Sequence, residues 1–164
     1  MALKGVFLIP GSGVEQLISV GTYADTISIP GSLQETSLYA LTLPARTFET
    51  NGDSLAFEFA GVFDDGADTQ FFISVGGAHI LISPAAVSAG QNPWVLSGRV
   101  LRSADEEIRA WATLTSVGGT VAMVNNGVQF DPAASSSIQL SAQSDTTGAV
   151  TLYAGTLVVV AISP

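Results

Sequence analysis

The sequence predicts an all-β fold, an antiparallel β-sandwich of the jelly-roll type with an extended N-terminal arm. Short runs rich in Val, Ile, Phe and Thr follow one another along the chain, and clusters such as Asn51-Gly52-Asp53 and Gly76-Gly77 separate them, as turns separate strands. Within these runs apolar and polar residues alternate, which indicates strands with one buried face. A helical pattern is nearly absent: only residues 105–111 could begin a helix, and a Thr-Leu-Thr-Ser-Val run follows them.

The alternation also predicts which side of each strand faces the core. Leu55, Phe57 and Phe59 share one face of their run, and Ile138 and Leu140 share one face of theirs. Short strands at this spacing, without helices between them, are typical of a sandwich or jelly roll. The strands expected in chain order are 38–43, 54–63, 69–75, 78–83, 94–103, 107–117, 120–130 with a break at Asn125-Asn126, 137–143 and 149–162.

The two tryptophans fall on opposite faces of one predicted hairpin, whose strands are joined by a polar turn at 103–107. Trp94 lies in phase with Leu96 and is expected in the core. Trp111 lies in phase with Arg109 and is expected on the outer surface. The outward tryptophan is a candidate for an interface or, alternatively, for a ligand or local packing.

Residues 1–35 differ from the rest because Pro-Gly-Ser sequences interrupt their extended runs. We predict an N-terminal arm over 1–35, for anchoring or strand exchange, followed by a jelly-roll domain over 36–164. The alternative is that 1–35 supplies extra edge strands to the same sandwich. The apolar run Val6, Phe7, Leu8 and Ile9 is a candidate interface, and it is too short for a secretory leader.

The C-terminal strand is apolar on both faces. Leu152 and Val158 alternate with Tyr153, Leu157 and Val159, whereas a strand of a simple two-sheet monomer shows one wet face. We therefore expect subunit packing there, or cover by the N-terminal arm. Tyr153, Leu157 and Val159 join Trp111 as predicted interface residues.

Composition excludes several classes of function. The 164 residues carry 14 acidic and 5 basic side chains, for a net charge of −9, so nucleic acid is not an expected partner. The absence of cysteine excludes disulfides and thiolate metal sites, and a single histidine leaves no multi-histidine site. The longest apolar stretch, 153–162, is about half of a membrane-spanning helix. We expect no cofactor, no membrane partner and no enzymatic activity.

Three acidic or histidine-containing segments are candidates for metal binding or catalysis. Asp64, Asp65 and Asp68 could bind calcium through oxygen ligands, but the spacing is not that of an EF-hand, and a solvated hairpin loop is preferred. The acidic cluster at 105–107 is expected to be a solvated turn rather than a glycosidase pair. His79 is expected to be satisfied by a neighbour on a sheet, because no Gly-x-Ser-x-Gly elbow accompanies it as in a Ser-His-Asp hydrolase.

From about residue 38 onward, the order of short motifs resembles the jelly roll of small structural proteins on tailed bacteriophage virions. The motifs are 41–47 (LTLPART), 51–55 (NGDSL), 60–63 (AGVF), 72–77 (FISVGG), 93–96 (PWVL) and 100–102 (VLR). The resemblance implies a head-decoration, head-fibre or tail-fibre module, commonly a trimer, and no catalytic residues belong to the pattern. The Asp-rich segment 64–68 departs from it, because similar proteins more often carry Asn and Lys there.

The expected function is therefore that of a non-enzymatic virion protein on the exterior of a capsid or tail. We expect a homotrimer that decorates or cements the capsid, or forms a head fibre, and attaches to the major capsid protein or another virion protein through its N-terminal arm. The alternative is a tail-fibre, receptor-binding or carbohydrate-binding module that uses Trp111 or the 64–68 loop on a host-surface glycan.

Overall fold

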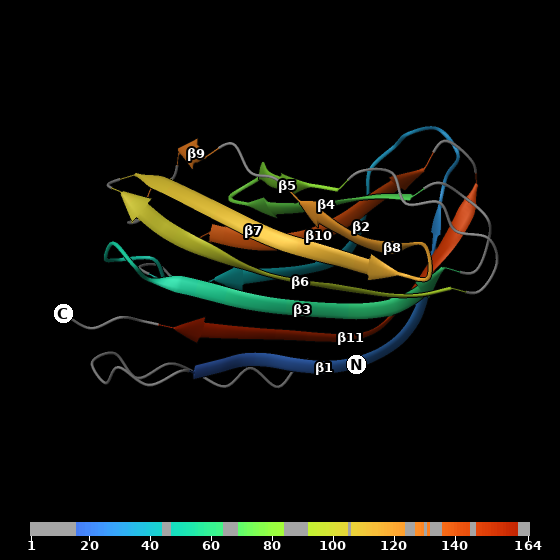
Figure 1. Ribbon diagram of the computed structural model, residues 1–164, viewed down its shortest axis with the longest axis horizontal. Coiled ribbons are helices and arrows are strands. Elements are labelled where there is room, and N and C mark those ends of the chain that lie inside the picture. Colours follow the sequence, from blue (N-terminus) through green and yellow to red (C-terminus); the bar gives the residue numbers. More distant parts are fainter. Residues whose placement is uncertain are drawn as a thin grey trace.

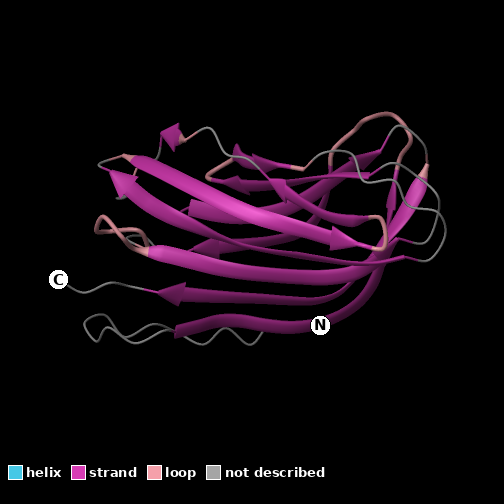
Figure 2. Cartoon of the chain, viewed as in Figure 1, coloured by secondary structure: helices cyan, strands magenta, loops and turns pink. Residues whose placement is uncertain are grey.

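The computed structural model describes residues 16–43, 47–63, 69–83, 92–104, 106–123, 127–129, 131, 136–144 and 147–160. Side chains are described in the same ranges except 16–26, 63, 136, 148–149 and 152–160. All regular elements in these ranges are strands, and they form two antiparallel sheets stacked face to face (Figures 1 and 2).

The larger sheet has the strand order β1-β11-β3-β6-β7-β8, with β9 also paired to β7, and the smaller sheet has the order β2-β10-β4-β5. The strands are β1 (Gln16–Ile29), β2 (Thr36–Leu43), β3 (Ser54–Phe63), β4 (Thr69–Val75), β5 (Ala78–Ile82), β6 (Asn92–Ala104), β7 (Glu107–Ser116), β8 (Gly119–Met123), β9 (Val128–Gln129), β10 (Ser136–Ser144) and β11 (Gly148–Val160).

The topology is that of a jelly roll. Four antiparallel pairs are nested in the sequence, namely β1 with β11, β2 with β10, β3 with β6 and β4 with β5. The outermost pair and the third lie in the larger sheet, and the other two lie in the smaller sheet. Strands β7 to β9 come between β6 and β10 in the sequence and extend the larger sheet. Two of them, β7 and β9, contact β5 of the smaller sheet. The predicted all-β jelly roll is confirmed.

The core lies between the sheets and contains the side chains that the alternation assigned to it. The Trp94 ring of β6 packs on the Phe71 ring of β4 with 4.7 Å between centroids, and Tyr39 of β2 packs on Phe59 of β3 at 5.3 Å. Both contacts join the larger sheet to the smaller one. The bulkiest fully buried side chains are Trp94, Phe48, Phe59, Phe71, Ile29, Leu43, Leu55, Ile73, Leu81, Leu96 and Ile108.

The N-terminal segment divides at residue 16. Strand β1 pairs with β11 of the same chain from Gln16 to Ile29, so these residues form an edge strand of the sandwich, one of the two alternatives for 1–35. The jelly roll therefore includes residues 16–29, which the sequence had assigned to the arm. Because β3 pairs with only one side of β11, the other side is open to a further strand, and β1 occupies it. Residues 6–9 lie outside the described ranges.

Strand β11 is an interior strand with β1 on one side and β3 on the other. Val150 and Thr151 follow each other on opposite faces, and both are buried. A register shift between Leu152 and Ala154 interrupts the alternation. The side chains of Tyr153, Leu157 and Val159 are not among those described, so their assignment to an interface stays a prediction.

Candidate functional site

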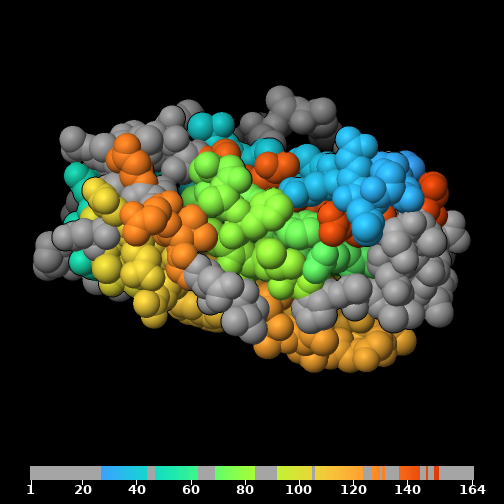
Figure 3. Space-filling view, turned by 90° about the horizontal axis from the view of Figure 1, so that it is seen from above, coloured from blue at the N-terminus to red at the C-terminus, as the bar shows by residue number. Residues whose placement is uncertain are grey.

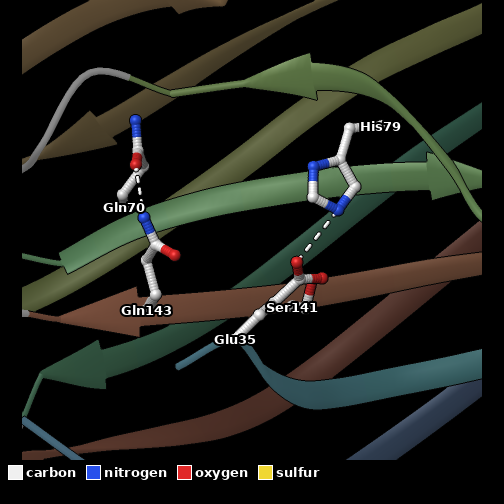
Figure 4. A network of polar contacts seen from close by, with 5 residues as sticks. All are labelled: Glu35, Gln70, His79, Ser141 and Gln143. Carbon is white, nitrogen blue, oxygen red and sulfur yellow. Dashed lines mark hydrogen bonds and ion pairs between the residues drawn. The ribbon is translucent and has the colours of Figure 1, made fainter. Parts of the chain in front are cut away.

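A polar network crosses the outer face of the smaller sheet (Figure 4). Glu35 comes directly before β2, His79 lies on β5, and Ser141 lies on β10. His79 Nε2 lies 2.9 Å from Glu35 Oε2, and the Ser141 hydroxyl donates a hydrogen bond to Glu35 Oε1. The His79 ring also packs on the Phe72 ring of β4, with 4.8 Å between centroids. One carboxylate thus joins the segment before β2 to two other strands.

The order of contacts in this network is not that of a nucleophilic triad. In such a triad the histidine lies between the serine and the carboxylate and takes the serine proton. Here Glu35 lies between Ser141 and His79 and accepts from the serine itself. The Ser141 residue is also fully buried. The expectation that His79 is satisfied by a neighbour on the sheet is confirmed.

A second pair of polar side chains extends the same surface. Gln143 of β10 donates to the Gln70 side-chain oxygen of β4 at 2.9 Å, and Gln70 donates to the Ser83 carbonyl at 2.8 Å. In the space-filling view, the blue segment 27–43 lies beside the green residues of β4 and β5 (Figure 3). This network is not predictable from the sequence, because alternation predicts that Gln70, Ser141 and Gln143 point outward but not which of them meet.

The outer face of the larger sheet carries Trp111, which is 51% exposed. The register places Arg99 of β6 directly opposite Trp111 of β7, while Arg109 lies two residues earlier on the same face of β7. The Arg109 Nε atom lies 3.0 Å from Glu107 Oε1. Trp94, in contrast, is 1% exposed. The predicted outward and inward positions of the two tryptophans are both confirmed.

Hydroxyl side chains cover the face beside Trp111. The Ser97 and Thr113 hydroxyls lie 3.4 Å apart across β6 and β7, and the Thr115 and Thr120 hydroxyls lie 3.1 Å apart across β7 and β8. Such cross-strand pairs keep side chains close to the sheet. The result is a band of hydroxyl groups next to the half-exposed Trp111 ring, with Glu58 of β3 directly opposite Ser97.

Several predicted site residues lie outside the described ranges. They include Asp64, Asp65 and Asp68, so the calcium hypothesis stays a prediction. Among the residues with described positions, no three His, Cys, Asp or Glu side chains gather as a metal site. At the acidic turn, Glu106 has a positive φ of 61° and Glu107 is bonded to Arg109. No helix in the described ranges is long and apolar enough to cross a membrane.

Comparison with known proteins gives likenesses of fold only. No family model and no curated protein matches the sequence. Among solved structures, a Lotus tetragonolobus seed lectin is 10% identical, with 94% of this chain and 96% of that chain covered and a TM-score of 0.48. Infectious bursal disease virus, Gx strain, is 11% identical, with 94% and 35% covered and a TM-score of 0.40. The VP2 subviral particle of that virus is 11% identical, with 96% and 46% covered and a TM-score of 0.29.

The chain therefore spans less than half the length of the two viral chains.

Proposed function

We propose that the chain is a non-enzymatic structural protein of a tailed-bacteriophage virion, a capsid decoration, cement or head-fibre protein that assembles as a homotrimer. The observation that carries the proposal is the outer face of the larger sheet, where Trp111 stands half exposed beside uncharged hydroxyl side chains. Aromatic residues are enriched at protein–protein interfaces, so the half-exposed Trp111 favours a contact with another protein surface.

The motif order from residue 38 onward supports the virion part of the proposal. The resemblance implies a jelly roll, and the nested strand pairs of the structure agree with that implication. Assembly is passive in this account: sheet faces pack against neighbouring copies, and a closed ring covers surface that one copy leaves open. The acidic excess repels nucleic acid and other polyanions.

The polar network of the smaller sheet supports a structural rather than a catalytic role. Both oxygens of Glu35 are engaged by side chains of the same chain. Ser141 is buried beneath that carboxylate. In this proposal the network holds the segment before β2 against β10 and β5, and it takes part in no reaction.

The proposed location is the exterior of the virion, with the part of the N-terminal arm that precedes β1 as its attachment to the major capsid protein or another virion protein. Electron microscopy of purified virions with a gold-labelled antibody against this chain tests the location. We expect label on the outside of the head. Absence of the chain from purified particles, or its enclosure with the DNA, would contradict the proposal. Label confined to the tail would favour the receptor-binding alternative.

A further inference from the structure

We propose that the two edges of the larger sheet join between copies, so that β8 of one chain pairs with residues 25–29 of β1 in the next chain. The inference rests on the proposed homotrimer and names the strands that carry it. Strand β8 lies beside β7, which carries Trp111, so a copy joined at this edge is also adjacent to the face named in the proposed function.

Both edge strands have one side without a partner among the described strands. The larger sheet ends in β1 on one side and in β8 on the other (Figure 1), and β1 pairs only with β11 while β8 pairs only with β7. Four of the five residues of β8 are exposed. Proteins often block such an edge with lysine, proline or an inward-pointing charge. The β8 sequence GTVAM has none of these, so its edge is open to another strand.

Each edge also carries an apolar side chain on the core face that its own chain covers only in part. Val121 of β8 lies directly opposite Leu114 of β7, which is 1% exposed, yet Val121 itself is 38% exposed. At the other edge, Ile27 of β1 lies opposite the buried Val150 and is only partly buried. A join between the edges places Ile27 of one copy beside Val121 of the next, where each side chain covers the other.

The direction and the length of the two edge strands match. Every neighbouring pair along the path β1-β11-β3-β6-β7-β8 is antiparallel, so β1 and β8 run in opposite directions. Copies related by a rotation about an axis along the strands therefore continue the antiparallel pattern where β8 meets β1. Residues 25–29 pair with β11 without a bulge, and β8 is also five residues long.

The threefold ring selects the opposite edge as the partner rather than the same edge. Pairing of β8 with β8, or of β1 with β1, is an isologous contact and gives a twofold dimer. A ring of three copies needs a contact between two different surfaces. Strands β1 and β8 are the two ends of the strand order in the larger sheet, so their pairing meets this condition.

The charge repulsion between copies does not fall on this contact. Strand β8 has no charged residue, and β1 has a single one, Asp25. Almost all of the net charge of −9 is therefore carried by other segments. At physiological ionic strength, exposed charges more than about 8 Å apart are largely screened. Main-chain hydrogen bonds between the edges therefore form without bringing like charges together.

Two lysine variants test the contact by sedimentation velocity over a concentration series. Val121→Lys places a charge in the middle of β8, as natural proteins do to protect an edge strand. Val117→Lys is the matched control, because it adds the same charge in the neighbouring turn, where Val117 is 70% exposed. We expect the dissociation constant of the assembly to rise by about 10-fold or more in Val121→Lys and to change little in the control. Circular dichroism verifies that both variants are folded.

Cross-linking tests which edges meet, because the chain has no cysteine of its own. In the register that sets Ile27 beside Val121, Ser28 of one copy lies opposite Thr120 of the next. We expect a short bismaleimide to join Ser28→Cys chains to Thr120→Cys chains after the two variants are mixed and allowed to exchange. Neither variant should be joined to itself, and the double variant should be joined into a closed trimer.

The outcomes separate this inference from the proposed function. If the native chain is a trimer but Val121→Lys assembles as tightly as the control and the two cysteine variants are not joined, the edge contact is overturned and the homotrimer stands. Cross-linking of either cysteine variant to itself also overturns the edge contact. Cross-linked ladders longer than three copies support the edge contact and overturn the homotrimer. A native chain that stays monomeric overturns both.

Discussion

Arg102 illustrates at the residue scale how one buried side chain fixes a loop against a strand. Its guanidinium donates to the backbone carbonyl of Phe48 at 3.0 Å and to that of Glu49. Its backbone N–H donates to the Asp53 carbonyl, and its carbonyl accepts from the Gly52 N–H, both at 2.9 Å. The segment between β2 and β3 is thereby fastened to β6. Buried carbonyl groups that lose such a donor retain the full cost of their desolvation.

Replacing this arginine is expected to destabilise the fold. Arg102→Met keeps most of the apolar stem and removes the donors, so we expect a loss of about 3 kcal/mol in the free energy of unfolding. The control is Arg109→Met, whose exposed ion pair with Glu107 contributes less than about 1 kcal/mol. Urea denaturation of both variants at the same dilute concentration measures the difference. Equal midpoints for the two variants would refute the role given to Arg102.

The sequence predicts the sides of strands at this scale but not the partners. Alternation assigns Trp94 and Leu96 to the inward side of their strand, where the structure has them, and Arg102 lies on the same side. Its acceptor Phe48 lies 54 residues away, and nothing in a strand pattern specifies a loop carbonyl at that distance. The same limit applies to Glu35 and Ser141, which are 106 residues apart.

At the scale of elements, Gly98 sets how closely β3, β6 and β7 approach on their core face. It lies between Phe57 and Ala112 in the cross-strand row. A Cβ atom at this position would lie 2.7 Å from Phe57 Cζ and 2.6 Å from Ala112 Cβ, and it would also meet the Trp111 carbonyl oxygen. The absence of a side chain gives the Phe57 ring its place in the core.

Two glycine-to-alanine variants test this packing. Gly98→Ala forces β6 away from its neighbours, and we expect a loss of about 3 kcal/mol in the free energy of unfolding. Gly118→Ala, in the β7–β8 turn, would place its Cβ 3.7 Å from Ser116 Oγ, an ordinary van der Waals contact, and should leave stability within about 0.5 kcal/mol. Thermal unfolding followed by circular dichroism compares them. A Gly98→Ala protein as stable as Gly118→Ala would mean that the strands can separate freely.

The positions of the strands were predictable, but the order in which they pair was only partly so. The expected run 54–63 is the observed β3, and 69–75 is the observed β4. Hairpin partners such as β6 and β7 follow from short turns. The pairing of β1 with β11 joins the two ends of the described chain. The residue pattern of each segment is compatible with pairing to several other strands, so the sequence does not specify this pair. The arm and edge-strand alternatives for 1–35 could not be separated for that reason.

Hydrogen exchange tests the place of β1. Because β1 pairs with β11 of its own chain, we expect peptides covering 16–29 to be protected from exchange even at concentrations where the protein is dissociated. Peptides from β11 should be protected to a similar degree, since β11 has partners on both sides. Protection of 16–29 that appears only on assembly would show instead that this strand is exchanged between copies.

At the scale of the whole molecule, the jelly roll combines a low content of charged residues with a half-exposed tryptophan on the outer face of its larger sheet. Charged residues make up 12% of the chain, about half of the usual share. On the outer face of the larger sheet, Arg99 lies opposite the half-exposed Trp111, and Arg109 pairs with Glu107. In the proposed assembly, this face packs against a neighbouring copy.

Sedimentation equilibrium of the purified chain at micromolar concentration is the most direct test of self-assembly. The proposed homotrimer predicts a species with three times the chain mass of 16.8 kDa, which dissociates on dilution. A soluble species of 16.8 kDa that persists throughout the micromolar range would contradict it.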